Sequence, residues 1–203
     1  SGLLRVNAPM SFGTTKLGPL IADFMALYPE LQIQLVLSDE QVDPLQEGLD
    51  VTLRIAELES SSLIARKIVP IDRVVCASGD YLARHGTPVH PNDLRDHTCL
   101  TYGFLATGNQ WKLSGPDGDH WIQPRWKLCA NNAEVLRDAA AKGCGIAVLP
   151  VFLAAEQLKS GVLRAILADY KPPALTLYAL YAPTKHLAVK VRLFIDFLVE
   201  RLR

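Results

Sequence analysis

The sequence predicts an α/β fold built on a largely parallel sheet. Strand-like and helix-like segments alternate over the first 56 residues, and a second alternating run follows in the later part of the chain. A helical crossover returns the chain to the same end of the sheet, so strands joined in this way pair in parallel. The 203 residues suffice for one compact α/β unit or two small lobes.

The first run contains three predicted strands and two predicted helices. A short apolar strand occupies residues 3–8, and apolar residues at three- and four-residue spacing predict a helix over residues 14–28 that a proline ends. Residues 31–37 alternate apolar and polar side chains, as in a strand with one buried face. We expect a short helix over residues 42–48, closed by a glycine, and a third strand over residues 50–56.

The later part repeats this logic. A long extended stretch over residues 63–78 is expected to break at residues 70–72, which include Pro70. The elements expected after it are a helix near 80–86, a helix-capping segment at 90–97, a strand at 99–103, a hairpin at 114–121 and a strand before Asn131. Next we expect a helix over 133–142, a strand before Pro150, a strand at 175–182 and an amphipathic helix over 187–202. The apolar face of this last helix consists of Val191, Phe194, Ile195, Leu198 and Leu202.

Composition excludes several classes of function. The 21 basic and 21 acidic residues give a net charge of zero, which provides no electrostatic surface for nucleic acid or an anionic membrane. The sequence contains no apolar run of roughly 20 residues and opens on no secretion signal, so we expect a soluble, cytoplasmic protein.

The sequence offers little support for catalysis. It contains no nucleophile elbow, phosphate loop or dinucleotide fingerprint, and we expect no cofactor. The cysteines stand far apart beside apolar residues, which predicts reduced core side chains: Cys76, Cys99, Cys129 and Cys144. The histidines lack metal-ligand spacing, so we expect no metal and exposed, polar surroundings for each of them: His85, His90, His97, His120 and His186.

Two helix starts are the candidate binding features. The Ser11–Thr14 loop and the Asn131–Ala133 segment each join a strand to a helix, and a hydroxyl or amide there is equally suited to capping the helix. Free backbone N–H groups and the positive helix end could instead bind a carboxylate. Arg54, at the end of an apolar strand, could pair with a carboxylate, although a solvated strand end or an ion pair with Glu57 is the more common role.

Several stretches occur in an order and spacing that are specific when taken together: "GLLRVNAPMSFGTTKLGPLIADFMALYPELQIQLVLSD", "GLDVTLRIAEL", "LIARKI", "RVVCASGDYLARHGTPVHPNDLRDHTCL", "ANNAEVLRDAAAKGCGIAVLPVFLAAEQLKSGVL" and "VRLFIDFLVERL". In these stretches the chain resembles the effector-binding domain of LysR-type transcriptional regulators over essentially its full length. The resemblance implies a type 2 periplasmic-binding-protein-like fold of two α/β lobes joined by two crossover strands. Residues 1–72 and 178–203 would form lobe I, and residues 73–177 would form lobe II.

The resemblance also implies where a ligand binds. In the family a small effector lies between the lobes, and its contacts map by position, not by chemistry, onto Pro9, Met10, Ser11, Phe12, Ser38, Asp39, Arg54, Ile55, Tyr102, Asn131 and Pro150. The residue types suggest that the effector is a small organic acid with an apolar part. The polar features are Arg54 and the helix starts, and their apolar neighbours are Met10, Phe12, Ile55 and Phe152.

By the same resemblance, the domain would change lobe geometry on binding its effector and so modulate DNA binding and transcription by a longer protein. It would pair as a homodimer through lobe I, with higher assembly possible in the full-length protein, and would contact no membrane. The family's N-terminal winged helix-turn-helix is absent from this chain, so DNA contact would need that missing domain. Two alternatives share the fold: a solute-binding protein for transport and, ranked last, a small enzyme using Cys144 or Arg54.

Overall fold

In the computed structural model the chain divides into two compact units, and both ends of the chain belong to the first. Unit 1 comprises Ser1–Ile71 and Leu175–Arg203, and unit 2 comprises Asp72–Ala174. The expected boundaries were after residue 72 and before residue 178. The structure describes residues 2–40, 48–57, 64–103, 110–183 and 186–203. The short helix expected over residues 42–48 lies outside the described residues, apart from Gly48.

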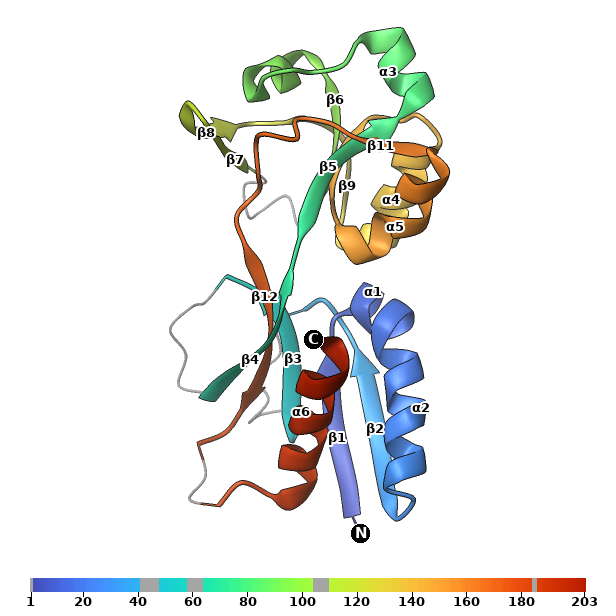
Figure 1. Ribbon diagram of the computed structural model, residues 1–203, viewed down its shortest axis with the longest axis vertical. Helices are drawn as coiled ribbons and strands as arrows, with labels where there is room; N and C mark the ends of the chain where they lie inside the picture. The colour runs from blue at the N-terminus through green and yellow to red at the C-terminus, as the bar shows by residue number, and fades with distance from the viewer. Residues whose placement is uncertain (1, 41–47, 58–63, 104–109, 184–185) are drawn as a thin grey trace. The chain divides into compact units, whose positions relative to one another are not determined.

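Unit 1 is built on a mixed five-stranded sheet. Its strand order is β2 (Leu31–Leu37), β1 (Gly2–Ala8), β3 (Val51–Ala56), β12 (Leu175–Tyr181) and β4 (Ile64–Ile71), as Figure 1 shows. The strand β1 runs parallel to β2 and β3, whereas β12 runs antiparallel to both β3 and β4. The sequence-predicted parallel pairing of the first three strands is therefore correct, and a segment from the far end of the chain completes the sheet.

The break expected within residues 70–72 is narrower than predicted. Pro70 belongs to β4 and lies opposite Thr176 of β12, and only Asp72 separates β4 from β5 (Arg73–Ser78). A proline is compatible with a strand at a sheet edge, where its missing N–H leaves no ladder bond unmade, and β4 is an edge strand of the described sheet.

The first helix begins earlier than the sequence predicted. It starts at α1 (Met10–Phe12), continues through a π-helical segment (Gly13–Leu17) and ends as α2 (Gly18–Leu27). Pro19 explains the π segment, because it has no N–H for an i−4 bond and its ring would clash with that carbonyl; the Gly18 N–H instead bonds Gly13 O, five residues back. The apolar periodicity starts only after this turn, so it misplaced the helix start at Thr14.

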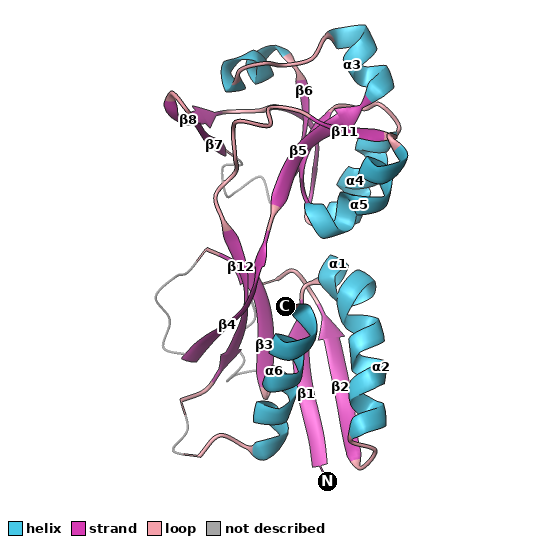
Figure 2. Ribbon diagram, in the orientation of Figure 1, coloured by secondary structure: helices cyan, strands magenta, loops and turns pink. Residues whose placement is uncertain are grey.

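Aromatic side chains join the helices of unit 1. The Phe24 ring of α2 lies 5.3 Å from the rings of Phe194 and Phe197 in α6 (Val189–Leu202), measured between centroids. The helix α6 also packs on β1 and β4, and Figure 2 shows the helices of this unit beside its strands. The predicted apolar face of α6 is confirmed for Val191, Phe194, Ile195 and Leu198, which are buried.

Unit 2 has a second five-stranded sheet and a separate hairpin. The sheet order is β11 (Leu163–Ala165), β5, β10 (Ile146–Pro150), β6 (Thr98–Tyr102) and β9 (Arg125–Ala130), with β6 parallel to both β9 and β10. The hairpin pairs β7 (Trp111–Gly115) with β8 (Gly118–Ile122) around Pro116 and Asp117, as the turn residues predicted. The helical elements of this unit are α3 (Gly79–His85), the 3₁₀ segment η2 (Pro91–Asp96), α4 (Ala133–Ala141) and α5 (Val151–Ser160).

The capping segment before η2 forms as the sequence predicted. His90 accepts a hydrogen bond from the Asn92 N–H through Nδ1, and the Asp93 carboxylate accepts one from the His90 N–H, which together make a capping box. Hydrogen bonds from the Val89 N–H and then the His90 N–H to its carboxylate lower the pKa of Asp93.

His97 is buried, contrary to the expectation that the histidines are exposed. The Tyr81 hydroxyl accepts from the Thr98 N–H at 3.1 Å and lies 2.8 Å from His97 Nδ1. Since the hydroxyl can then donate its own proton, this chain of bonds suits a neutral His97. Burial, followed by the nearby His85 charge, lowers the pKa of His97.

We therefore expect His97 to make the fold less stable in acid. Its pKa in the folded state lies below the unfolded value of about 6.5, so the unfolded chain binds more protons below that pH. The free energy of unfolding should fall as the pH drops from about 6.5 toward the depressed pKa of the folded state. Urea unfolding at pH 7.5 and 5.5 should show a smaller loss for His97→Gln than for wild type; equal losses would show that His97 does not carry this effect.

Candidate functional site

The predicted site residues of unit 1 lie at one edge of its sheet. Parallel β1, β2 and β3 end at the same side, so the residues that follow or end them converge there. These residues are Pro9, Met10, Ser11 and Phe12 after β1, Ser38 and Asp39 after β2, and Arg54 and Ile55 near the end of β3. We call this group the unit 1 edge.

Asp39 occupies the helix start that was expected to receive a ligand carboxylate. Its Oδ1 accepts a hydrogen bond from the Met10 N–H at 2.9 Å, and the side chain places a negative charge at the first turn of α1. This arrangement stabilises the helix, because anionic side chains favour the positive helix end. The interpretation of this turn as a carboxylate-binding N-terminus is therefore wrong for the Met10 N–H.

Ser11 contributes a buried hydroxyl at the same edge. The Oγ atom has no hydrogen-bond partner among the described residues, although the residue is only 8% exposed. Thr14 was a candidate helix cap together with Ser11, but its hydroxyl donates back to the carbonyl oxygens of Met10 and Ser11. Neither hydroxyl caps this helix, and the Ser11 hydroxyl stays without a partner among the described residues.

Gly13 holds this helix against β2. A Cβ atom on Gly13 would lie 2.2 Å from a methyl carbon of Leu37, the last residue of β2. Ser38, the next residue, donates its N–H to Ala8 O and accepts from the Glu40 N–H through its hydroxyl. The loops after β1 and β2 are thus fastened to each other beside the unit 1 edge.

Arg54 and Ile55 are both half-buried in β3. They lie opposite Tyr178 and Leu177 of β12, so β12 borders this side of the unit 1 edge. Arg54 supplies a permanent positive charge at the edge, whereas Asp39 supplies a negative one.

Unit 2 repeats the arrangement at its own sheet. Tyr102 ends β6, Asn131 follows β9 and Pro150 ends β10. The strand β6 pairs in parallel with both β9 and β10. Their carboxyl ends therefore gather the three predicted residues, which we call the unit 2 edge. Asn132, not Asn131, caps α4 by accepting from the Val135 N–H at 3.1 Å.

Thr101 is a candidate binding residue that the sequence reasoning missed. It precedes Tyr102 in β6, is 1% exposed, and its hydroxyl has no hydrogen-bond partner among the described residues. Thr52, inside β3, has a buried hydroxyl of the same kind. A threonine at a strand end carries no distinctive sequence pattern, but its place next to a predicted contact residue could have suggested it.

The cysteines divide by burial, which corrects one prediction. Cys76 and Cys99 are buried free thiols, and burial raises the pKa of each to about 12, so both stay protonated and unreactive near neutral pH. Cys144 was expected to be a core residue, but it is exposed. The Gly143–Gly145 turn explains this, since both glycines have positive φ and carry the chain around Cys144 before β10 begins.

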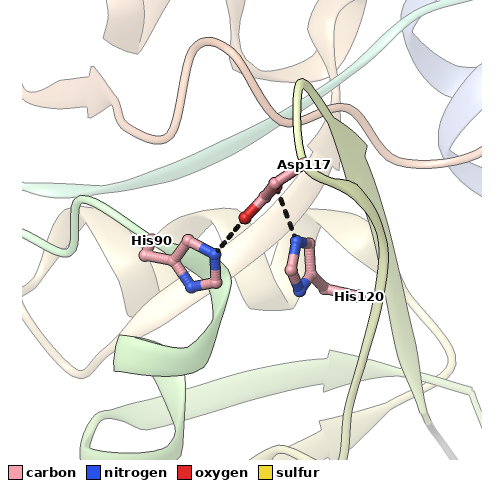
Figure 3. A group of neighbouring side chains, drawn as sticks. All are labelled: His90, Asp117 and His120. Atoms are coloured by element: carbon pink, nitrogen blue, oxygen red, sulfur yellow. Dashed lines mark hydrogen bonds and ion pairs between the residues drawn. The ribbon is translucent and has the colours of Figure 1, made fainter.

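The expectation of exposed surroundings for every histidine is also wrong for His90 and His120, which are half-buried. The two Nε2 atoms each lie 2.8 Å from an oxygen of Asp117, and the three side chains face one another in Figure 3. The side chains come from the start of η2, from the turn between β7 and β8, and from β8 itself. Spacing along the sequence could not show this group, because His90 lies 27 residues before Asp117.

Asp39 is expected to stabilise unit 1 through the helix start. Asp39→Ala removes both the acceptor for the Met10 N–H and the charge at the helix end, so the free energy of unfolding should fall by about 1 kcal/mol. Asp39→Asn keeps an acceptor oxygen and should lose less. Urea denaturation of both variants measures the difference; an unchanged stability of Asp39→Ala would refute the capping role.

Within the described residues, no helix is both long enough and apolar enough to cross a bilayer. The family model for the LysR substrate binding domain matches residues 1–203. The chain is 33% identical over 202 residues to the probable HTH-type transcriptional regulator LtrA of Klebsiella pneumoniae, covering 98% of this chain and 65% of that protein. It is 34% identical to the HTH-type transcriptional regulator CrgA of Neisseria meningitidis serogroup C strain 8013, covering 99% of this chain and 67% of that protein.

Solved structures give the same assignment. The CrgA regulatory domain of Neisseria meningitidis, a LysR-type regulator, matches with a TM-score of 0.86 and 33% identity over the full length of both chains. The full-length Vibrio cholerae virulence activator AphB matches with a TM-score of 0.86 and 33% identity, covering 99% of this chain and 68% of that chain.

The architecture is thus a periplasmic-binding-protein-like α/β fold, as the resemblance implied. The chain spans 65%, 66% and 60% of three curated relatives, all HTH-type transcriptional regulators. On the family match and these identities, the chain belongs to the LysR substrate binding domain family.

Proposed function

We propose that this chain is the ligand-sensing domain of a LysR-type transcriptional regulator and that it binds a small effector at the unit 1 edge. The observation that carries the proposal is the Ser11 hydroxyl at this edge, which is buried without a hydrogen-bond partner among the described residues. A buried polar atom without a hydrogen bond is costly in a folded protein, and a bound ligand would remove that cost. The relatives, which are transcriptional regulators, support a sensing role.

The charges at the unit 1 edge restrict how an acidic effector can bind. Asp39 already holds the Met10 N–H, so a second carboxylate at that helix end would meet like charge. Arg54 is the cation of this edge, and Met10, Phe12 and Ile55 supply apolar surface beside it. We propose a small organic acid whose carboxylate faces Arg54 and whose polar groups bond the Ser11 hydroxyl.

The proposed output is a shift between conformations. An effector that binds one conformation of the domain more tightly favours that conformation, and a longer regulator could transmit this shift to its DNA-binding part. We propose that the domain does not catalyse a reaction and acts in the cytoplasm. The buried, protonated thiols of Cys76 and Cys99 support the first statement. The two alternatives, a transport protein and an enzyme on this fold, are less favoured because the relatives of this chain are transcriptional regulators.

We further propose that the domain pairs with a second copy through α2 and β2. Both elements carry large apolar side chains that are about half exposed: Met25 and Leu27 on α2 and Val36 on β2. The strand β2 is also an edge strand of the described sheet, with an unpaired side. Adjacent exposed apolar groups on a helix and an edge strand are suited to burial against an identical surface.

The effector proposal can be tested with four probes: benzoate, succinate and their uncharged amides. We expect at least one acid to raise the melting temperature of wild type more than its amide does. Ser11→Ala should weaken that binding roughly three- to tenfold, since it removes one hydrogen bond. The ligand-free variant should be as stable as wild type or slightly more so, because the lost hydroxyl had no partner among the described residues.

Three further variants sharpen this test. Ser11→Trp should block binding sterically, and Arg54→Gln should remove the preference for the acid over the amide. Ser160→Ala is the control, because this hydroxyl at the end of α5 donates to Gln157 O, away from either edge. Equal affinities of wild type and Ser11→Ala for a bound acid would place the binding site elsewhere, and no response to any acid would refute the acid proposal.

The dimer proposal predicts that Val36→Glu separates the two copies. A charge at this position would be buried without a partner in the dimer, so sedimentation velocity should show a monomer where wild type is a dimer. Val162→Glu is the control, because Val162 is exposed to the same degree in unit 2, outside the proposed interface. A dimeric Val36→Glu protein, or a wild type that stays monomeric at high concentration, would contradict the proposal.

A further inference from the structure

A second polar cluster lies in unit 2, apart from its sheet edge. Asp117, at the tip of the β7–β8 hairpin, places Oδ2 2.8 Å from His90 Nε2 and Oδ1 2.8 Å from His120 Nε2. The three ligand atoms all lie within 4.8 Å of one another, and Figure 3 shows both rings turned toward the carboxylate. The two imidazole rings are nearly perpendicular, with centroids 4.5 Å apart.

We propose that His90, Asp117 and His120 bind a divalent transition-metal ion of the Zn²⁺ class. Two imidazole nitrogens and one carboxylate oxygen form a ligand set that such ions prefer, whereas Mg²⁺ and Ca²⁺ prefer oxygen atoms alone. Zn²⁺ bonds of roughly 2.0–2.2 Å to nitrogen and oxygen require donor atoms about 3.3 Å apart in a tetrahedron. The three donors, which lie within 4.8 Å of one another, would therefore adjust to this spacing when an ion binds.

The site is accessible to an ion from solvent. The side chains of His90, His120 and Asp117 are 30%, 17% and 48% exposed, so three ligands are fixed and the remaining coordination positions can hold water. The two oxygens of the Asp117 carboxylate already face the two rings, each at 2.8 Å from an Nε2 atom.

Tyr170 supports the cluster from behind. Its ring contacts both histidine rings edge-on, with centroids 5.4 Å from His90 and 5.8 Å from His120. Burial, and then the Asp117 charge, raises the pKa of Tyr170, so its hydroxyl stays protonated as a possible donor to the carboxylate. Gly115 packs on the same ring, where a Cβ atom would come within 2.4 Å, and this contact fixes the hairpin tip. Such supporting groups orient metal ligands in known sites.

The protons of the two histidines must move when an ion binds. In the metal-free arrangement each Nε2–H donates to Asp117, so each proton must shift to Nδ1 to free Nε2 for the metal. His120 Nδ1 makes no hydrogen bond among the described residues and can take the proton. His90 Nδ1 accepts from the Asn92 N–H at 3.1 Å, and protonation there would break this bond. Metal binding is therefore coupled to loss of one cap of η2.

This coupling gives the site a structural consequence. An ion at this position would join the β7–β8 hairpin to the segment before η2, which Asp117 otherwise links through hydrogen bonds alone. At the same time it would release the Asn92 amide. A merely structural His–Asp–His cluster would do neither when Zn²⁺ is added.

The experiment is a titration of the tag-free protein with ZnCl₂ by isothermal calorimetry. We expect one ion per chain, with Asp117→Asn and His120→Gln each weakening binding at least tenfold. His90→Asn should also weaken binding, but asparagine can still cap η2, so the fold of this variant is retained. His85→Gln is the matched control, because His85 lies in the same unit but stacks on Tyr81, outside the cluster.

Two spectroscopic measurements separate the metal site from nonspecific binding. Co²⁺ should give the visible absorption of a low-coordinate N/O site in wild type and not in His120→Gln. Hydrogen exchange at the Asn92 amide should become faster when Zn²⁺ binds, as the cap is lost. Wild-type affinity in Asp117→Asn and His120→Gln, or no saturable Zn²⁺ binding to wild type, would overturn the proposal.

Discussion

The parallel pairing of β1 with β2 and β3 is the constraint on which the rest of this structure depends. Parallel strands all end on one side, so the loops that follow them must meet there. The Asp39 side chain can reach the Met10 N–H only because β1 and β2 end level with each other, at Ala8 and Leu37. In unit 2, β6, β9 and β10 impose the same arrangement on Tyr102, Asn131 and Pro150.

The same constraint explains why the helix start of unit 1 is already supplied with an anion. A helix start at the end of a parallel strand attracts an anion, and in unit 1 a side chain of the protein fills that position. The hydroxyls of Ser11 and Thr101 lower the stability of the ligand-free fold, because they are buried without partners among the described residues. A ligand that satisfied the Ser11 hydroxyl would recover this free energy as affinity.

The sequence predicted elements whose signals are local, and it failed where a distant group decides the structure. The strand Leu31–Leu37, the Pro116–Asp117 turn and the cap at Asn132 follow from residues close together in the chain. The start of the first helix depended instead on Asp39, which lies 29 residues after Met10. The π-helical segment after this start depended on Pro19 in α2. Thr101 and the cluster of His90, Asp117 and His120 were missed for the same reason, since burial and convergence exist only in three dimensions.

The place of β12 has a consequence for how the protein is made. This strand fills the position between β3 and β4, yet it is the last strand of the chain. During synthesis the whole of unit 2 emerges before β12, as one continuous segment that can form its sheet at once. The segment Gly2–Ile71 must meanwhile wait, with the sides of β3 and β4 that β12 will fill unpaired, until β12 leaves the ribosome. This segment is therefore translated before unit 2 but receives its missing strand after it, and it is the part of the two units most exposed to misassembly while the chain is being made.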